Sequence, residues 1–171
     1  EETIVVPVSA ITVKDLAADT VTGLGLDGRP QSALTTTYYS LVDNKAIAST
    51  DAASTKWDIA FSSTKILING GTSGPGIGGA FVHIGSFDTF TSIPADSIFK
   101  TDNANAASYA IPLGSGKAWY TYDGLTTLVS PIAGRVLVIR TATGKYAKIE
   151  IISYYKGGVT LPATASVNDK L

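Results

Sequence analysis

The stretch RVLVIRTATGKYAKIEIISYYK, residues 135–156, decides the fold because it has the pattern of two strands joined by a tight turn. The four residues TATG end in Gly144, which can take the positive φ angle that such turns favour. Arg140 and Lys145, near the turn, are expected to lie in solvent. The stretch therefore predicts an antiparallel hairpin near the centre of the fold. Side chains alternate along a strand, so the two faces of the first half carry different pairs: Val136 with Val138, and Leu137 with Ile139.

Shorter runs of the same character precede this hairpin. Residues 35–49 have the pattern of a second hairpin with its turn at Asp43 and Asn44, followed by one helical turn. Glycine and proline interrupt the rest, which predicts a loop at 70–79 and a surface excursion from 15 to 31. Further strands are expected at 3–8, 57–61, 64–69 and 80–84.

The periodicity of the whole chain indicates one fold class. No long segment has the period of an amphipathic helix, and residues 87–110 are only weakly patterned. We therefore predict an all-β fold of antiparallel sheets packed in a sandwich-like arrangement, with long loops. The 171 residues suffice for one core, and no stretch resembles an interdomain linker, so a single domain over 1–171 is expected.

Composition excludes several classes of function. A net charge of −1 leaves no electrostatic footprint for nucleic acid, so no nucleic-acid partner is expected. The chain has no cysteine and no methionine, which excludes thiol nucleophiles, disulfides and iron–sulfur sites within it. Its longest apolar runs are too short to cross a membrane.

Two motifs have plainer structural interpretations. Gly74, Gly76 and Gly79 satisfy the string G-x-G-x-x-G, but a strand follows them where a dinucleotide site needs a helix. His83, the single histidine, alternates with Phe81 in the manner of a partly exposed strand residue. We therefore expect no nucleotide site and no histidine chemistry here.

The acidic residues do not form a catalytic group in the sequence. Apart from the terminal pair Glu1 and Glu2, they are spread singly, and Asp58 beside Trp57 is expected to be an ordinary polar-face or turn-bonding residue. No G-x-S-x-G elbow is present either. The protein is therefore predicted not to be an enzyme.

A cluster of aromatic residues marks the segment GKAWYTYDGLTTL, residues 116–128. Trp119, Tyr120 and Tyr122 fill three of four consecutive positions before a break at Asp123 and Gly124. The segment could be a hairpin packed on the core, or it could form the wall of a pocket for a flat, apolar ligand. Tyrosine hydroxyls are also the plausible axial oxygen donors for ferric haem in this composition.

Four stretches together resemble one family. In order and spacing, KWDIAF (56–61), NGGTSGPGIGGA (69–80), GKAWYTY (116–122) and the run from Pro131 to Lys156 resemble the HmuY family of surface haem-binding lipoproteins from Bacteroidetes. The resemblance covers about residues 42–156. It implies an all-β fold with a right-hand-like arrangement of packed sheets, and a non-enzymatic, haemophore-like role.

The resemblance also implies a location and partners. The mature chain would be tethered at the outer membrane, facing outward, through a lipidated cysteine upstream of this sequence. An outer-membrane receptor or a surface complex would be its partner. Members of the family continue past the SYYK strand into a further strand, so we expect the C-terminal strand to be missing or trimmed here.

The sequence departs from the family at the iron ligands. In haem-binding members two axial side chains, paired histidines or paired methionines, hold the iron. Carried over, one position falls at about Gly124, with Thr127 as the nearest alternative. The other falls between Ser97 and Ser115, where the chain has no histidine or methionine. The usual axial pair therefore cannot be assembled.

Two hypotheses follow from the resemblance and this departure. In the first, the protein binds haem or a related flat apolar ligand without the usual pair, and Tyr109 or Tyr122 serves at most as a weak iron ligand. In the second, it is an accessory or interaction subunit of a surface complex and has lost haem binding. The candidate pocket residues are Tyr109, Trp119, Tyr120, Tyr122, Gly124 and Thr127.

Overall fold

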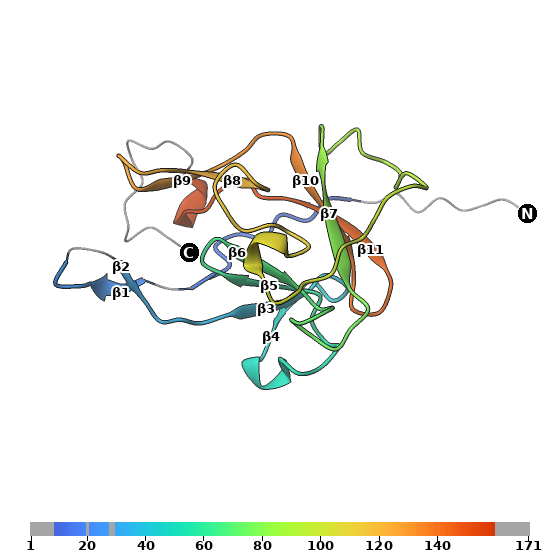
Figure 1. Ribbon diagram of the computed structural model, residues 1–171, viewed down its shortest axis with the longest axis horizontal. Coiled ribbons are helices and arrows are strands. Elements are labelled where there is room, and N and C mark those ends of the chain that lie inside the picture. The colour runs from blue at the N-terminus through green and yellow to red at the C-terminus, as the bar shows by residue number, and fades with distance from the viewer. Residues whose placement is uncertain (1–8, 20, 28–29, 160–171) are drawn as a thin grey trace, which may run out of the picture.

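The computed structural model describes residues 9–19, 21–27 and 30–159 (Figure 1). This part of the chain forms eleven strands and three 3₁₀ helices of three residues each: η1 (Ser49–Asp51), η2 (Ala106–Ser108) and η3 (Lys156–Gly158). All of these strands pair antiparallel, so the predicted all-β, antiparallel fold class is confirmed. The strand predicted at 3–8 and the tail from 160 onward lie outside the described residues.

One sheet has four strands, in the order β4 (Lys45–Ile47), β3 (Thr37–Ser40), β5 (Ile59–Ser62) and β6 (Lys65–Ile68). The predicted hairpin over 35–49 is confirmed as β3 and β4, and Asn44 in its turn has a φ of 51°. Asparagine tolerates this left-handed conformation better than most residues, which explains its place in the turn. The helical turn expected next is η1.

The second sheet contains the stretch that decides the fold. Its order is β11 (Tyr146–Glu150), β10 (Arg135–Arg140) and β7 (Gly79–Ile84), so the predicted hairpin is confirmed with β10 in the middle. Gly144 has a φ of 90° in the turn, as expected. Leu137 lies opposite Val82 on one side and Ile149 on the other, which sets the register of the sheet.

The two sheets pack together in a sandwich-like way around one hydrophobic core (Figure 1). Leu137 and Ile139 of β10 are fully buried in it, together with Ile59 of β5 and Ile68 of β6. Apolar burial of this kind contributes most of the favourable free energy of folding.

The other face of β10 is also buried, by a segment without regular structure. The ring centroids of Phe90 and Phe99 lie 6.5 and 5.1 Å from the ring centroid of Phe81 on β7. Val138, which pairs with Phe81, is almost fully buried. Lys148 of β11 donates hydrogen bonds from Nζ to the carbonyl oxygens of Phe87 and Phe90. These contacts attach residues 86–100 to the sheet as a third layer.

One prediction about the central hairpin was wrong. Arg140 is half-buried instead of lying free in solvent, because its guanidinium group stands 5.4 Å from the centre of the Phe99 ring and donates a 2.9 Å hydrogen bond to the carbonyl of Ile77. Lys145 is exposed, as predicted.

Two buried carboxylates join distant segments of backbone. Asp58 accepts hydrogen bonds from the amides of Leu41 and Ala142 at 2.8 and 2.9 Å. Asp102 accepts from the amides of Ile68 and Ala110 at 2.9 and 3.0 Å. Both side chains are buried, so of the two roles predicted for Asp58 the polar-face one was wrong, whereas its bonds to the turn residues Leu41 and Ala142 agree with the turn-bonding one. Backbone N–H groups in the interior need such acceptors.

The glycine-rich loop at 70–79 packs around a buried asparagine, and a strand follows it as predicted. The amide of Gly76 donates to Oδ1 of Asn69 at 2.9 Å. A Cβ atom on Gly74 would lie 2.2 Å from the same oxygen, so only glycine fits there. These glycines serve close packing, which accounts for the G-x-G-x-x-G string without a nucleotide.

Two small hairpins complete the fold. The predicted excursion at 15–31 contains most of the first, formed by β1 (Val21–Leu24) and β2 (Pro30–Ser32). The second consists of β8 (Tyr120–Asp123) and β9 (Leu128–Pro131). Tyr120, Leu128 and Val129 join the main core, so the inner part of this hairpin is fixed to the body of the protein.

Candidate ligand-binding site

An open cavity of about 330 Å³ lies where the β8–β9 hairpin meets the turn between β5 and β6. We call it the tyrosine cavity. Ser63, Ser115 and Tyr122 at its edge are exposed, so it opens to solvent. Its volume is at the lower end of the range for small-molecule sites, about 300–1,000 Å³. The lining residues are Ser63, Thr64, Ser115, Tyr120, Tyr122, Val129 and Tyr154.

Trp119 fixes the wall behind the cavity. It is buried, and its indole N–H donates a 3.2 Å hydrogen bond to the carbonyl of Thr64 in the β5–β6 turn. Its ring lies 4.9 Å from the ring of Tyr120 and 6.2 Å from that of Tyr154. Contacts of this kind between rings stabilise beyond the area they bury, so the aromatic wall is well ordered.

Tyr154 and Tyr155, near the C-terminal end of the described chain, form hydrogen bonds with two residues that line the cavity. The hydroxyl of Tyr154 lies 3.1 Å from Oγ of Ser63. The hydroxyl of Tyr155 accepts a 2.9 Å hydrogen bond from the amide of Val129. Burial raises the pKa of both phenols, and for Tyr154 the nearby charge of Asp19 acts in the same direction. Both side chains therefore keep their protons at neutral pH.

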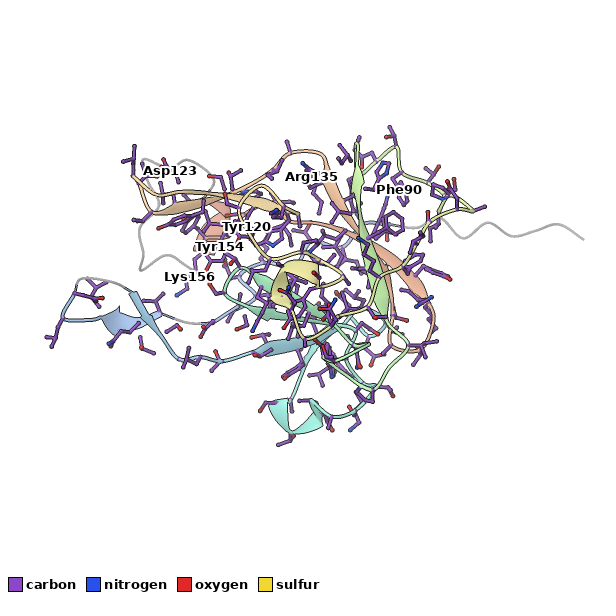
Figure 2. All side chains as sticks on the ribbon, in the orientation of Figure 1. Phe90, Tyr120, Asp123, Arg135, Tyr154 and Lys156 are labelled. Carbon is purple, nitrogen blue, oxygen red and sulfur yellow. The ribbon has the colours of Figure 1, made fainter. Side chains whose placement is uncertain are left out.

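The turn beyond β8 is exposed and held by its own aspartate. The carboxylate of Asp123 accepts hydrogen bonds from the Leu125 amide at 2.9 Å and from the Thr126 hydroxyl at 2.8 Å. These two bonds lower the pKa of Asp123. Gly124 and Thr127 lie in this turn, both exposed and neither lining the cavity. Figure 2 shows Asp123 at the outer end of the hairpin, away from Tyr120.

This turn gives a prediction for pH titration. A carboxyl group whose pKa is lowered in the folded protein stabilises the fold above its ordinary pKa, and the contribution is lost as the pH falls through the lowered value. In an NMR titration, the Asp123 carboxyl should therefore titrate below its ordinary value of 3.8. Thr126→Val should raise the midpoint, whereas Thr121→Val on the same hairpin should leave it unchanged. An equal effect of both variants would contradict the assignment.

The structure brings some of the predicted pocket residues together and leaves others apart. Tyr120 and Tyr122 line the cavity, and Trp119 stands behind it. Tyr109 follows the η2 helix and is half-buried outside the lining. Sequence reasoning missed five lining residues: Ser63, Thr64, Ser115, Val129 and Tyr154. Only Tyr154, in the SYYK stretch, carried a signal, because that stretch belongs to the family resemblance.

The side chains around the cavity offer hydroxyl oxygens and little else to a metal ion. His83 lies on β7, where its ring is 4.4 Å from that of Phe90 and does not reach the cavity. Within residues 9–19, 21–27 and 30–159 no three His, Cys, Asp or Glu side chains gather as metal ligands would. In the same ranges no helix has the length and apolar character needed to cross a membrane.

Comparison with known families decides the relationship. The family model described as HmuY protein matches residues 33–164. The chain belongs to the HmuY family. Membership indicates a haem-binding-related protein of the cell surface, and the family itself is a non-enzymatic one. The match extends the HmuY resemblance on both sides and includes the whole tyrosine cavity. No curated protein matches the chain.

Proposed function

We propose that this protein is a cell-surface binding protein of the haem-acquisition type, which holds haem or a related flat apolar ligand without a histidine or methionine axial pair. The observation that carries the proposal is the tyrosine cavity itself. Tyr120, Tyr122 and Tyr154 surround it in a member of the HmuY family, next to the turn where the family resemblance places an iron ligand.

Ring contact is the interaction this cavity offers most readily. Aromatic side chains bury large areas and pack against other flat π systems in offset or edge-on geometry. With a volume of about 330 Å³, the cavity accepts one edge of a tetrapyrrole, while the rest of the macrocycle stays at the mouth. The charged propionates would remain in solvent there, since none of the lining side chains is cationic.

The location and partners are proposed from the family alone. A lipidated cysteine upstream of this chain would tether the protein at the outer membrane, with the cavity facing outward. An outer-membrane receptor or surface complex would take the ligand onward. Radiolabelled palmitate incorporated by the full-length protein in its native cells would support the tether, and its absence would oppose it.

Titration with ferric haem tests the binding function. We expect a saturable change in the Soret band at micromolar haem, and Tyr122→Ala should weaken binding by about fivefold or more through loss of ring contact. Tyr146→Ala is the matched control. Tyr146 is 58% exposed, similar to the 49% of Tyr122, but lies on β11 in another sheet. No saturable change, or an equal effect of the two variants, would refute haem binding in this cavity.

A second candidate function is an accessory or interaction subunit of a surface complex. The observation that favours it is the tip of the β8–β9 hairpin, where Leu125 is 97% exposed beside the exposed Tyr122. A partner would use these two side chains together as one apolar contact surface. Purification from native membranes tests this function: a retained partner that Leu125→Glu releases would support it, and a monodisperse monomer would oppose it.

A further inference from the structure

The hydroxyl groups of two of the buried tyrosines at the cavity, Tyr154 and Tyr155, are engaged within the protein. Tyr154 shares a hydrogen bond with Ser63, and Tyr155 accepts one from the amide of Val129. A tyrosine that binds ferric haem does so through its oxygen, and loss of the proton strengthens that bond. The burial of these rings opposes the loss of the proton. Neither phenol is therefore suited to bind iron.

Among the three phenols of the lining, Tyr122 is the one whose ring is exposed. Its backbone amide donates to Oγ of Ser115 at 2.8 Å, which fixes the strand at the rim of the cavity. The side chain itself is half-exposed, so water competes for its hydroxyl. Tyr120, the third phenol of the lining, is 6% exposed and packs its ring on Trp119, so it meets a ligand through little of its surface. The remaining hydroxyl groups, on Ser63, Thr64 and Ser115, belong to aliphatic alcohols, which stay protonated in water and bind ferric iron poorly.

The ring surfaces, in contrast, are held firmly. Tyr120 is buried and packs on Trp119, which packs on Tyr154, which in turn packs on Tyr155 at 5.4 Å. This aromatic series runs from the cavity wall into the main core, where Tyr154 and Tyr155 belong to the hydrophobic cluster. A ligand ring that enters the cavity therefore meets a preformed aromatic wall, and preformed sites lose little free energy to ordering.

We infer that the tyrosine cavity recognises the tetrapyrrole ring and not its central metal, so that metal-free and metal-bearing porphyrins bind with closely similar affinity. This inference rests on the proposed function, and it names the ligand class of the same site. Ring contact depends on the π surface, which the metal-free macrocycle shares with haem. The cavity thus offers contacts to the ring of haem but no pair of axial ligands to its iron.

The test is a set of three titrations of the whole chain: with ferric haem, zinc protoporphyrin and metal-free protoporphyrin IX, each followed by absorbance and by quenching of tryptophan fluorescence. We expect the three dissociation constants to agree within about threefold. Tyr122→Phe keeps the ring and removes the hydroxyl, so it should leave the ratios of the three dissociation constants unchanged. Tyr122→Ala removes the ring and should weaken all three by a similar factor.

The outcomes separate this inference from the proposed function. If ferric haem binds about thirtyfold more tightly than the metal-free ring, and Tyr122→Phe or Tyr109→Phe removes the difference, a phenol binds the iron and the inference is wrong while the function stands. If none of the three porphyrins binds, the proposed function fails, and the inference fails with it. Melting curves of each variant show whether a loss of binding reflects a loss of folding.

Discussion

Asp58→Ala is expected to lower the free energy of unfolding by about 3–5 kcal/mol, because one buried and one partly buried backbone amide lose a charged acceptor at once. The carboxylate accepts from the amide of Leu41, just after β3, and from that of Ala142, in the turn between β10 and β11. It therefore connects the two sheets of the sandwich. Alanine leaves both amides without an acceptor at a site that is 2% exposed.

Denaturant unfolding followed by tryptophan fluorescence measures this loss. Asp58→Asn keeps one oxygen acceptor and should lose an intermediate amount. Asp43→Ala is the control, because Asp43 is exposed and its ion pair with Lys45, at 3.5 Å, stands in water. That variant should change stability by at most about 0.5–1 kcal/mol. A loss of under about 1 kcal/mol for Asp58→Ala would show that water replaces the carboxylate.

The central hairpin could be predicted because its signal is local. Alternating apolar side chains over residues 135–156 and a glycine at the turn specify two paired strands without reference to the rest of the chain. The third layer, residues 86–100, could not be predicted in this way. Its phenylalanines at 87, 90 and 99 follow no strand or helix period, and they are half-buried because β7 and β11 provide a surface for them.

The residues of the candidate site also differ in whether a local sequence pattern predicts them. Tyr120 and Tyr122 could be predicted as its wall because they stand two positions apart on one strand and so share a face. The contact between Ser63 and Tyr154 joins residues 91 positions apart, and no sequence pattern links them. The role of Asp58 was missed for a similar reason, since its two amide partners lie 17 and 84 positions away.

Asn69→Ala is the second change with a large expected effect, again a loss of about 3–5 kcal/mol. The side chain is fully buried and donates to the carbonyls of Ser54 and Trp57 at 2.8 and 2.7 Å. It also accepts from the amide of Gly76 at 2.9 Å. Removing it leaves three polar groups without partners and a cavity under the glycine-rich loop, so limited proteolysis should also cut this loop faster.

Asn69→Asp tests the hydrogen bonds of the Asn69 side chain separately from its shape. The aspartate has nearly the same volume, but its oxygens would face the carbonyls of Ser54 and Trp57, and its charge would be buried. Burial should raise the pKa of the new carboxyl, so this variant should be least unstable in acid and lose stability as the pH rises from the ordinary aspartate pKa through the raised pKa of the folded state. Asn103→Ala is the control: it removes two exposed hydrogen bonds, one donated to the Ser108 carbonyl and one accepted from the Asn105 amide, and should cost about 1 kcal/mol or less. If Asn69→Asp were as stable as the parent at neutral pH, the two hydrogen bonds that Asn69 donates would not be what fixes the glycine-rich loop. The close packing of the glycines alone would then account for the stability of this loop.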